Sequence, residues 1–405
     1  MFENIIAQSA VDQLCTDIQN GSDVPSMLFF GPPFSGKSSA ALELSRVYSC
    51  EDKAEWKCSC PSCEMHRILS HDDLLLLGSR SFSADILACK SSFLNNAQNQ
   101  GVKLLFYRAL RKLQLRFSPV VLENDSKTAK AVSSVLLSLD EGLNELLTLD
   151  LKTCGQKDIE KLANSLVKDA LKLEDEGLSD SIPVDHIRSA AYWCRLKPAG
   201  RRKTLIIENA EYMSNASLNS LLKLLEEPPE TVSIVLTAQR REAIMETILS
   251  RLRPYRFLKR DAKGEKDVIR RVFQDISDES LSVYLESFLQ QNAEKLQPLA
   301  VWFIASLKSC VQGRGEKSAA VIKEVLSKSN NFKDISFSDF MKANLDLLSG
   351  AARTAKDYKI IAYNELFRKY INEAVSAVDV YNVNADIIFE ALFYKLKTAL
   401  RRCHG

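Results

Sequence analysis

The 405-residue sequence lacks several features that mark specialised classes of protein. Its 54 Lys and Arg residues nearly balance its 52 Asp and Glu residues, which leaves a net charge of +2. No overall field therefore draws the chain to nucleic acid or an anionic membrane, and such contacts would need a local patch or a partner. No internal repeat or long low-complexity tract is present. The 46% hydrophobic and 26% charged content is that of an ordinary globular protein.

Long apolar runs are also absent. The longest stretch without a charged residue is 24–36, shorter than the roughly 18 residues that a membrane span needs. The first residues, Met-Phe-Glu-Asn-Ile-Ile, lack the basic segment of a secretory signal. We therefore expect a cytoplasmic protein with no membrane contact, whose ten cysteines are not paired in disulfides.

Short apolar runs predict four buried strands, over 25–30, 73–77, 203–208 and 232–237. Between the last two, leucines at helical spacing predict a helix over 214–227. Ser214 would cap its start, and the Pro-Pro pair that follows prevents its continuation. Strands that alternate with helices are typical of a parallel sheet with helices on both faces, so the sequence predicts an α/β core.

Two further regions are predicted to be helical. Between about Phe82 and Ser181, apolar residues from Ile159 to Leu171 mark one amphipathic helix, which a polar linker follows. After Asp261 the helical periodicity continues and ends in a packed helix over 386–397. We expect a helical insertion in the core and a helical C-terminal third.

The first predicted strand leads into a loop that matches the pattern G-x-x-x-x-G-K-[ST], with a helix after it. Backbone N–H groups and the helix N-terminus of such a loop form an anion cradle. Lys37 can reach the outer phosphates, and the Ser38 hydroxyl can ligate Mg²⁺. The sequence therefore predicts a nucleotide site made by Gly31, Pro32, Pro33, Phe34, Ser35, Gly36, Lys37, Ser38 and Ser39.

The third predicted strand ends where P-loop proteins carry acidic residues. The first carboxylate there holds the Mg²⁺ shell and the next orients attacking water. Glu208 can serve the metal, but Asn209 cannot act as a base. Glu211 is either a substitute base or a solvated residue, and we favour the second interpretation. The sequence thus predicts nucleotide binding with impaired hydrolysis.

Four of the ten cysteines fall within fourteen positions: Cys50, Cys58, Cys60 and Cys63. Four thiolates suit a tetrahedral Zn²⁺ site and leave no open position for catalysis. The sequence therefore predicts a structural zinc site, with His66 as a reserve ligand.

The predicted insertion contains a stretch, 86–122, with six Lys or Arg residues and no Asp or Glu. Such a stretch could bind the phosphates of DNA or RNA. Alternatively, it is a helical hairpin that buries its leucines and exposes its basic residues to solvent, and we favour this interpretation.

Taken together, these residues resemble the clamp-loader branch of the AAA+ ATPases, the bacterial DNA polymerase III gamma/tau and delta prime subunits. The resemblance covers the N-terminal Phe-Glu-Asn-Ile-Ile-Ala-Gln, the P-loop and the cysteine cluster. It continues through 183–188, 205–214, the very specific Leu-Leu-Lys-x-Leu-Glu-Glu-Pro-Pro stretch and Ile-Leu-Ser-Arg at 248–251. Most of the insertion has no counterpart in it.

The resemblance assigns two more residues. It implies that Thr237 is the sensor of the γ-phosphate and that Arg251 is an arginine finger acting on a neighbouring subunit. Without the resemblance, Arg251 would be interpreted as a surface arginine. Asn209, Leu252 after the finger and the lack of a lid sensor motif after Asp261 favour delta prime, which hydrolyses little ATP itself.

The resemblance also implies an architecture and an assembly. We expect an AAA+ domain over 1–258, with a zinc module at about 50–66 and the insertion at about 80–181. A helical lid over 259–312 and a helical collar over 313–405 would follow. The chain would bind ATP and Mg²⁺ and join gamma/tau and delta subunits. The assembly would load the sliding clamp onto primer-template DNA.

Three rival functions stay open at this stage. The intact P-loop keeps a hydrolysing gamma/tau-type motor possible. Outside the family, a P-loop kinase would need an acid or base in the insertion and gives Arg251 no role. A standalone nucleic-acid-binding protein would need tight, salt-sensitive binding, which the near-zero net charge disfavours.

Overall fold

The computed structural model describes residues 1–21, 24–79, 81–179, 181–312, 318–329, 337, 340–341, 343–345, 347–348, 358–379 and 383–404. The chain divides into two compact units, Met1–Glu286 and Ser287–Gly405. In the described part, no helix is long and apolar enough to cross a membrane. The predicted lid and collar boundaries stay predictions, and parts of 313–405 lie outside the described residues.

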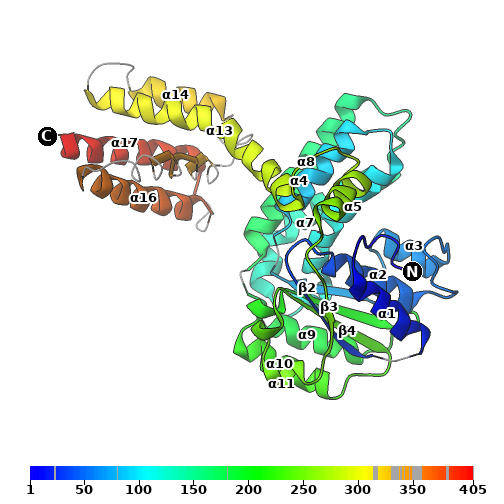
Figure 1. Ribbon diagram of the computed structural model, residues 1–405. Helices are drawn as coiled ribbons and strands as arrows, with labels where there is room; N and C mark the ends of the chain where they lie inside the picture. Colours follow the sequence, from blue (N-terminus) through cyan, green and yellow to red (C-terminus); the bar gives the residue numbers. More distant parts are fainter. Residues whose placement is uncertain are drawn as a thin grey trace. The chain divides into compact units, whose positions relative to one another are not determined.

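A five-stranded parallel sheet forms the centre of the first unit (Figure 1). Its strands are β1 (Ser26–Phe30), β2 (Leu74–Gly78), β3 (Lys203–Glu208), β4 (Val232–Ala238) and β5 (Arg253–Arg256), in the order β2-β3-β4-β1-β5. The four strands predicted from apolar runs are confirmed to within a residue at each end. Strand β5 was not predicted, because only Tyr255 of its four residues is buried.

Side chains of the sheet alternate between two apolar cores. On β1, Met27 and Phe29 belong to one core and Leu28 to the other. The first core includes α1 (Ser9–Gln19), α2 (Lys37–Ser49) and α3 (Pro61–Arg67). The second includes α6 (Pro119–Leu122), α9 (Val184–Arg195), α10 (Asn215–Glu226) and α11 (Glu246–Leu249). Helices on both faces confirm the predicted α/β class.

Helix α10 confirms the predicted helix over 214–227. The Ser214 hydroxyl accepts the N–H of Ser217 at 3.2 Å, so it is the N-cap that the sequence predicted.

The insertion between β2 and α9 is helical, as predicted. It contains α4 (Ser83–Asn95), α5 (Gln100–Gln114), the 3-10 turn η1 (Leu115–Phe117), α6, α7 (Ser126–Thr148) and α8 (Gln156–Gly177). Phe93 of α4 stacks on Phe106 of α5 with ring centroids 5.7 Å apart, and α7 packs along α8. The short 3-10 turns η2 (Ala210–Tyr212) and η3 (Arg241–Ala243) follow β3 and β4 in the core.

The described residues after β5 form helices joined by loops, and no further strand occurs among them. They form α12 (Ala262–Val268), the π-helical turn η4 (Ile269–Phe273) and α13 (Leu281–Gln312), which runs from the first unit into the second. The second unit also contains α14 (Ser318–Lys328), α16 (Tyr358–Asp379) and α17 (Ala385–His404). Phe389, Phe393 and Leu396 of α17 are fully buried, which confirms the predicted packed C-terminal helix.

Candidate functional site

The P-loop joins the central strand β1 to helix α2, as the sequence predicted. Gly36 is the N-cap of α2 in a left-handed conformation (φ 94°), and no side chain caps this end of the helix. The first N–H groups of a helix have no partner within it, so they can receive an anion. The backbone of 31–39 therefore fits the phosphates of a nucleotide.

Gly31 lies at a point where no other residue fits. Its φ of +150° is unfavourable for a residue with a side chain, and a Cβ there would lie 2.0 Å from the Phe257 carbonyl oxygen. The close approach arises because β5 pairs with β1, and the Phe257 N–H donates to the Phe30 carbonyl at 2.8 Å. The end of β5 thus fixes the start of the P-loop.

Lys37 is buried and folded back over its own loop. Its Nζ donates to the Gly31 and Pro32 carbonyls at 2.6 Å each and to Ser35 Oγ at 3.3 Å. These are the bonds that an ammonium group would exchange for phosphate oxygens.

Arg260 was not predicted as a site residue, but it lies against the P-loop. Its Nη1 donates to the Phe34 carbonyl and its Nε to the Ile6 carbonyl at 3.0 Å. Nearby, the Gln8 amide exchanges two hydrogen bonds with the Leu258 backbone, at 2.8 and 2.9 Å. The segment after β5 thus connects the N-terminal segment to the nucleotide loop. The only signal for this contact in the sequence was that the N-terminal segment and the segment after β5 each lie next to a motif of the resemblance.

The carboxyl ends of β3 and β4 bring together two predicted site residues. The Thr237 hydroxyl, which is buried, accepts the Asn209 N–H at 3.1 Å. Asn209 adopts a left-handed conformation (φ 52°) directly after β3. Because β1 and β4 are parallel neighbours, this pair lies at the same sheet edge as the P-loop. The hydroxyl thus couples the end of β3 to β4, the strand beside β1.

Glu208, predicted to serve the Mg²⁺ shell, is buried at the end of β3. Its carboxylate forms a salt bridge with the guanidinium of Arg116, which comes from η1 of the insertion. The residues present therefore do not offer Mg²⁺ a free carboxylate at this position.

Glu211 corrects one interpretation. It is not a solvated residue, because its Oε1 accepts the Gln239 N–H at 3.0 Å just after β4, while its Oε2 is buried. The carboxylate ties η2 to the end of β4.

Arg251 follows α11, and its hydrogen-bond partners lie on α10, on α11 and on Ser250, which directly follows α11. Its guanidinium contacts Glu226 Oε1 at 2.7 Å and donates to the Thr247 carbonyl at 2.6 Å. Its side chain is 33% exposed, so it is accessible to another molecule. Nothing in these contacts brings it to the P-loop of its own chain.

The four predicted cysteines gather at one point. The sulfur atoms of Cys50, Cys58, Cys60 and Cys63 all lie within 4.8 Å of one another, and no other such cluster occurs among the described residues. Cys50 Sγ lies 3.7 Å from Cys58 Sγ and 3.9 Å from Cys60 Sγ. Four sulfurs at this spacing fit a tetrahedral metal ion of the zinc type.

Several groups around the cluster donate hydrogen bonds to its sulfur atoms. Arg46 Nη1 donates to Cys63 Sγ at 3.0 Å and the Asp52 N–H to Cys50 Sγ at 3.4 Å. Burial raises the pKa of the Cys60 thiol, but hydrogen bonds from the backbone of Glu51 and Cys63 outweigh this and lower the pKa to about 7. Burial raises the pKa of the Cys63 thiol, and the Arg46 guanidinium opposes this. Donors to the sulfurs are the surroundings that a zinc–thiolate site needs.

His66, the reserve ligand, is not part of the sulfur cluster. It is buried and stacks on His71 with ring centroids 4.3 Å apart. Burial, together with the nearby His71, Arg108 and Arg46, lowers the pKa of His66 to about 3, so the ring is neutral. His66 is therefore a core residue beneath the cysteine cluster.

The stretch 86–122 includes most of the α4–α5 helical pair and buries Leu110 and Leu113, as the favoured interpretation expected, but several of its basic residues do not form a solvated face. Arg108 donates from Nη1 to the His66 and Arg67 carbonyls, and Arg111 donates from Nε to the Leu69 carbonyl at 3.2 Å. Lys103 donates to two carbonyls at the end of α7. These cations, with Arg116, point into the protein and attach the insertion to the segment after the cysteine cluster and to the sheet. They are correspondingly unavailable to nucleic-acid phosphates.

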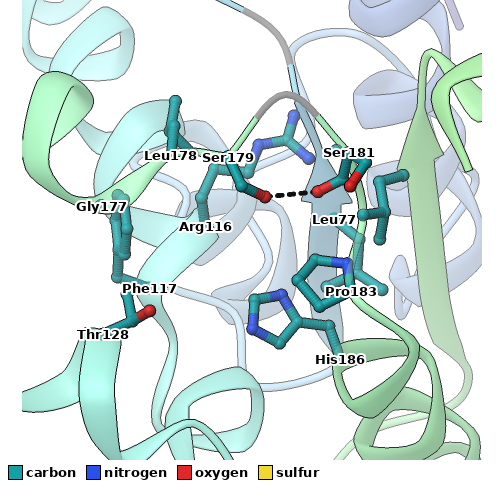
Figure 2. Close-up of a pocket in the computed structure, with 12 residues that line it drawn as sticks. Leu77, Arg116, Phe117, Thr128, Gly177, Leu178, Ser179, Ser181, Pro183 and His186 are labelled. Carbon is teal, nitrogen blue, oxygen red and sulfur yellow. Dashed lines mark hydrogen bonds between the residues drawn. The ribbon is translucent and has the colours of Figure 1, made fainter.

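A small pocket lies where the insertion meets the sheet (Figure 2). Arg116 and His186 are among the residues around it, and the Ser179 hydroxyl donates to the Ser181 carbonyl at its rim. His186 Nε2 lies 3.3 Å from Asp125 Oδ2. Burial raises the pKa of the Asp125 carboxyl, but the Thr128 N–H and His186 outweigh this and lower the pKa. The pocket has both apolar and polar lining residues, and one of them is Arg116, the partner of Glu208.

The sheet order, the P-loop and the helices on both faces fit the α/β core of an AAA+ protein. Comparison with family models matches residues 122–261 to the family described as DNA polymerase III, delta subunit. This segment of the chain is thus similar to that DNA polymerase III family. Among solved structures the chain is similar to a DNA polymerase III gamma subunit-related protein of Thermotoga maritima, with 18% identity and a TM-score of 0.26. That match covers 54% of this chain and 80% of the other. Comparison with curated proteins gives no match.

Proposed function

We propose that the chain is a delta prime-like subunit of a clamp loader. It would hold ATP on the P-loop, assemble with gamma/tau and delta subunits, and help to place a sliding clamp on primer-template DNA. The observation that carries this proposal is the family match over 122–261, because that range contains Asn209, Thr237 and Arg251. The sensor and finger positions thus fall within the segment that relates the chain to DNA polymerase III.

Weak hydrolysis follows from the residues at the end of β3. The side chain of Asn209 ends in an amide where a motor subunit needs a carboxylate to orient water. The backbone N–H of Asn209 donates to the Thr237 hydroxyl. An amide accepts no proton near neutral pH, so this chain would bind ATP without turning it over efficiently.

Arg251 supports a role in a neighbouring site. A partly exposed guanidinium beside α10 can stabilise charge that develops on the γ-phosphate of another subunit's nucleotide. Contact with such a phosphate would replace the ion pair with Glu226.

The cysteine cluster supports a structural zinc ion. Cys50, Cys58, Cys60 and Cys63 would hold it, and it would fix the segment between α2 and β2. Four protein ligands leave no open position for a reacting group.

A hydrolysing gamma/tau-type motor is the second candidate, favoured by one observation. The P-loop has its lysine, its uncapped helix and the glycine that the close approach of β5 requires. The two candidates differ in whether this chain's own nucleotide is consumed.

The test is purification of the tagged full-length chain from its own cells, with identification of the subunits and nucleotide that accompany it. We expect other DNA polymerase III subunits and about one adenine nucleotide for each copy of the chain. A Lys37→Ala variant should lose the nucleotide, whereas the exposed Lys161→Ala control should keep it. A permanent monomer without nucleotide would contradict the proposal.

A further inference from the structure

The ion pair between Arg116 and Glu208 joins two segments that are 92 positions apart in the chain. Arg116 comes from the insertion, and Glu208 ends β3 of the sheet. Their side chains are only 3% and 6% exposed. The pair therefore lies inside the protein, at the sheet edge where the P-loop also begins.

The surroundings of Arg116 are shaped to hold its guanidinium at this point. The Phe82 ring lies beneath it, with 5.5 Å from the guanidinium carbon to the ring centroid. Gly78 lies opposite Glu208 in the register of β2 and β3, and a Cβ on it would lie 3.2 Å from Arg116 Nη1 and 2.6 Å from the Glu208 carbonyl oxygen. The Glu208 carbonyl and the φ of +142° thus require a glycine here, and its lack of a side chain also leaves room for the guanidinium.

The segment that carries Phe82 is fixed as well. Glu174 of α8 accepts the Ser81 hydroxyl at 2.6 Å and the Phe82 N–H at 3.1 Å. Figure 2 shows Arg116 between α8 and the end of β2. Three parts of the chain thus converge to place one cation on one carboxylate.

A carboxylate at the end of this strand normally supports Mg²⁺ on the phosphates of a bound nucleotide. A guanidinium is not deprotonated in proteins, so the pair with Glu208 carries no net charge. A metal ion at Glu208 would have to compete with the Arg116 guanidinium and break this buried pair. The structure thus has a permanent cation on the carboxylate at the end of β3, the position at which other P-loop proteins support a removable one.

We propose that Arg116 takes the place of divalent metal at Glu208, so that nucleotide affinity of this chain does not depend on Mg²⁺. The inference rests on the proposed nucleotide binding and adds its regulation. The insertion then has a specific role: Arg116 is a positioning residue that fixes the metal requirement of the neighbouring site.

The test uses the full-length chain and a fluorescent ADP analogue, titrated with excess Mg²⁺ and with EDTA. For the natural chain we expect the dissociation constants measured with Mg²⁺ and with EDTA to agree within about twofold. A difference this small is less than the change in affinity that two coupled ligands typically cause in each other. Arg116→Gln should bind the analogue at least about fivefold more tightly with Mg²⁺ than with EDTA, because Glu208 becomes available to the metal. Arg188→Gln, an exposed arginine in an i,i+3 pair, is the matched control and should behave like the natural chain.

Two further measurements keep the test decisive. In Arg116→Gln, Mn²⁺ spectroscopy with ADP should show a bound ion that the natural chain lacks. The double variant Arg116→Gln/Glu208→Gln, which leaves no buried charge unpaired, should again bind without metal dependence. Strong Mg²⁺ dependence in the natural chain would overturn the inference. If the natural chain binds the analogue neither with Mg²⁺ nor with EDTA, the proposed function is overturned, and the inference with it.

Discussion

At the scale of single residues, the site depends on contacts that lie far apart in the sequence. The P-loop glycine Gly31 is needed because β5 brings the Phe257 carbonyl against it. Arg260 and Arg116 reach the two halves of the site from the segment after β5 and from the insertion. Each residue is explained by a partner that sequence spacing does not reveal.

Replacing Gly31 by alanine tests the close approach at β5. A Cβ at 2.0 Å from a carbonyl oxygen forces backbone movement, so we expect a loss of about 2 kcal/mol or more in the free energy of unfolding. Nucleotide binding should also fall. Gly21→Ala is the control, because Gly21 has φ +66° but nothing within 4 Å of its Cβ position. It should cost about 1 kcal/mol, for the backbone conformation alone. Equal losses in denaturant unfolding of the two variants would contradict the account.

The motif residues were predictable because their chemistry is local. The P-loop pattern, the four cysteines and the Ser214 cap each depend on neighbours a few positions away, and the structure places them as expected. Arg116 and Arg260 were not found, because a lone arginine carries no local signal for a partner 92 or 226 positions away. The same limit explains why the pattern of 86–122 predicts its helices and buried leucines but not the inward direction of its basic residues.

At the scale of elements, the parallel sheet was largely predictable because buried strands are continuous apolar runs. Strand β5 escaped because its sequence, Arg-Pro-Tyr-Arg, is charged and only Tyr255 points into the core. The Tyr255 hydroxyl donates to Asp17 at 2.7 Å, so this edge strand is held by α1 as well as by β1. Its place in the sheet comes from packing that apolar patterning does not encode.

The segment after the cysteine cluster is joined to helix α5. Arg108 and Arg111 of α5 donate to carbonyls at 66, 67 and 69, directly after the cysteines. The proposed binding of a metal ion by the cysteines would therefore stabilise the segment that α5 contacts as well as the cluster itself.

Removal of the metal tests this coupling. We expect one zinc ion for each chain, and hydrogen exchange after chelation should rise in α3 and in α5 near Arg108, while α10 stays protected. Cys58→Ser should lose the zinc, whereas Cys154→Ser, outside the cluster, should keep it. A chain prepared under reducing conditions without zinc, or with α5 unaffected by chelation, would contradict the prediction.

At the scale of the whole molecule, the chain combines an α/β core, an insertion attached to it by buried cations, and a separate helical unit. The attachment explains how about a hundred residues can interrupt the core without breaking its sheet, since β2 and β3 remain paired along their full lengths. In a clamp loader, this arrangement would leave the P-loop edge and Arg251 as two distinct surfaces for two neighbours.

The most direct test of the central proposal is the DNA-stimulated ATPase rate of the reconstituted clamp loader, measured with variants of this chain alone. If this chain supplies an arginine finger to a neighbouring subunit but hydrolyses little ATP itself, the two variants should give different results. Arg251→Ala should lower the rate of the whole assembly at least about fivefold, because a neighbour's site loses its cation. Lys37→Ala should leave the rate nearly unchanged. A rate that falls with Lys37→Ala and survives Arg251→Ala would show a motor subunit and contradict the delta prime-like assignment.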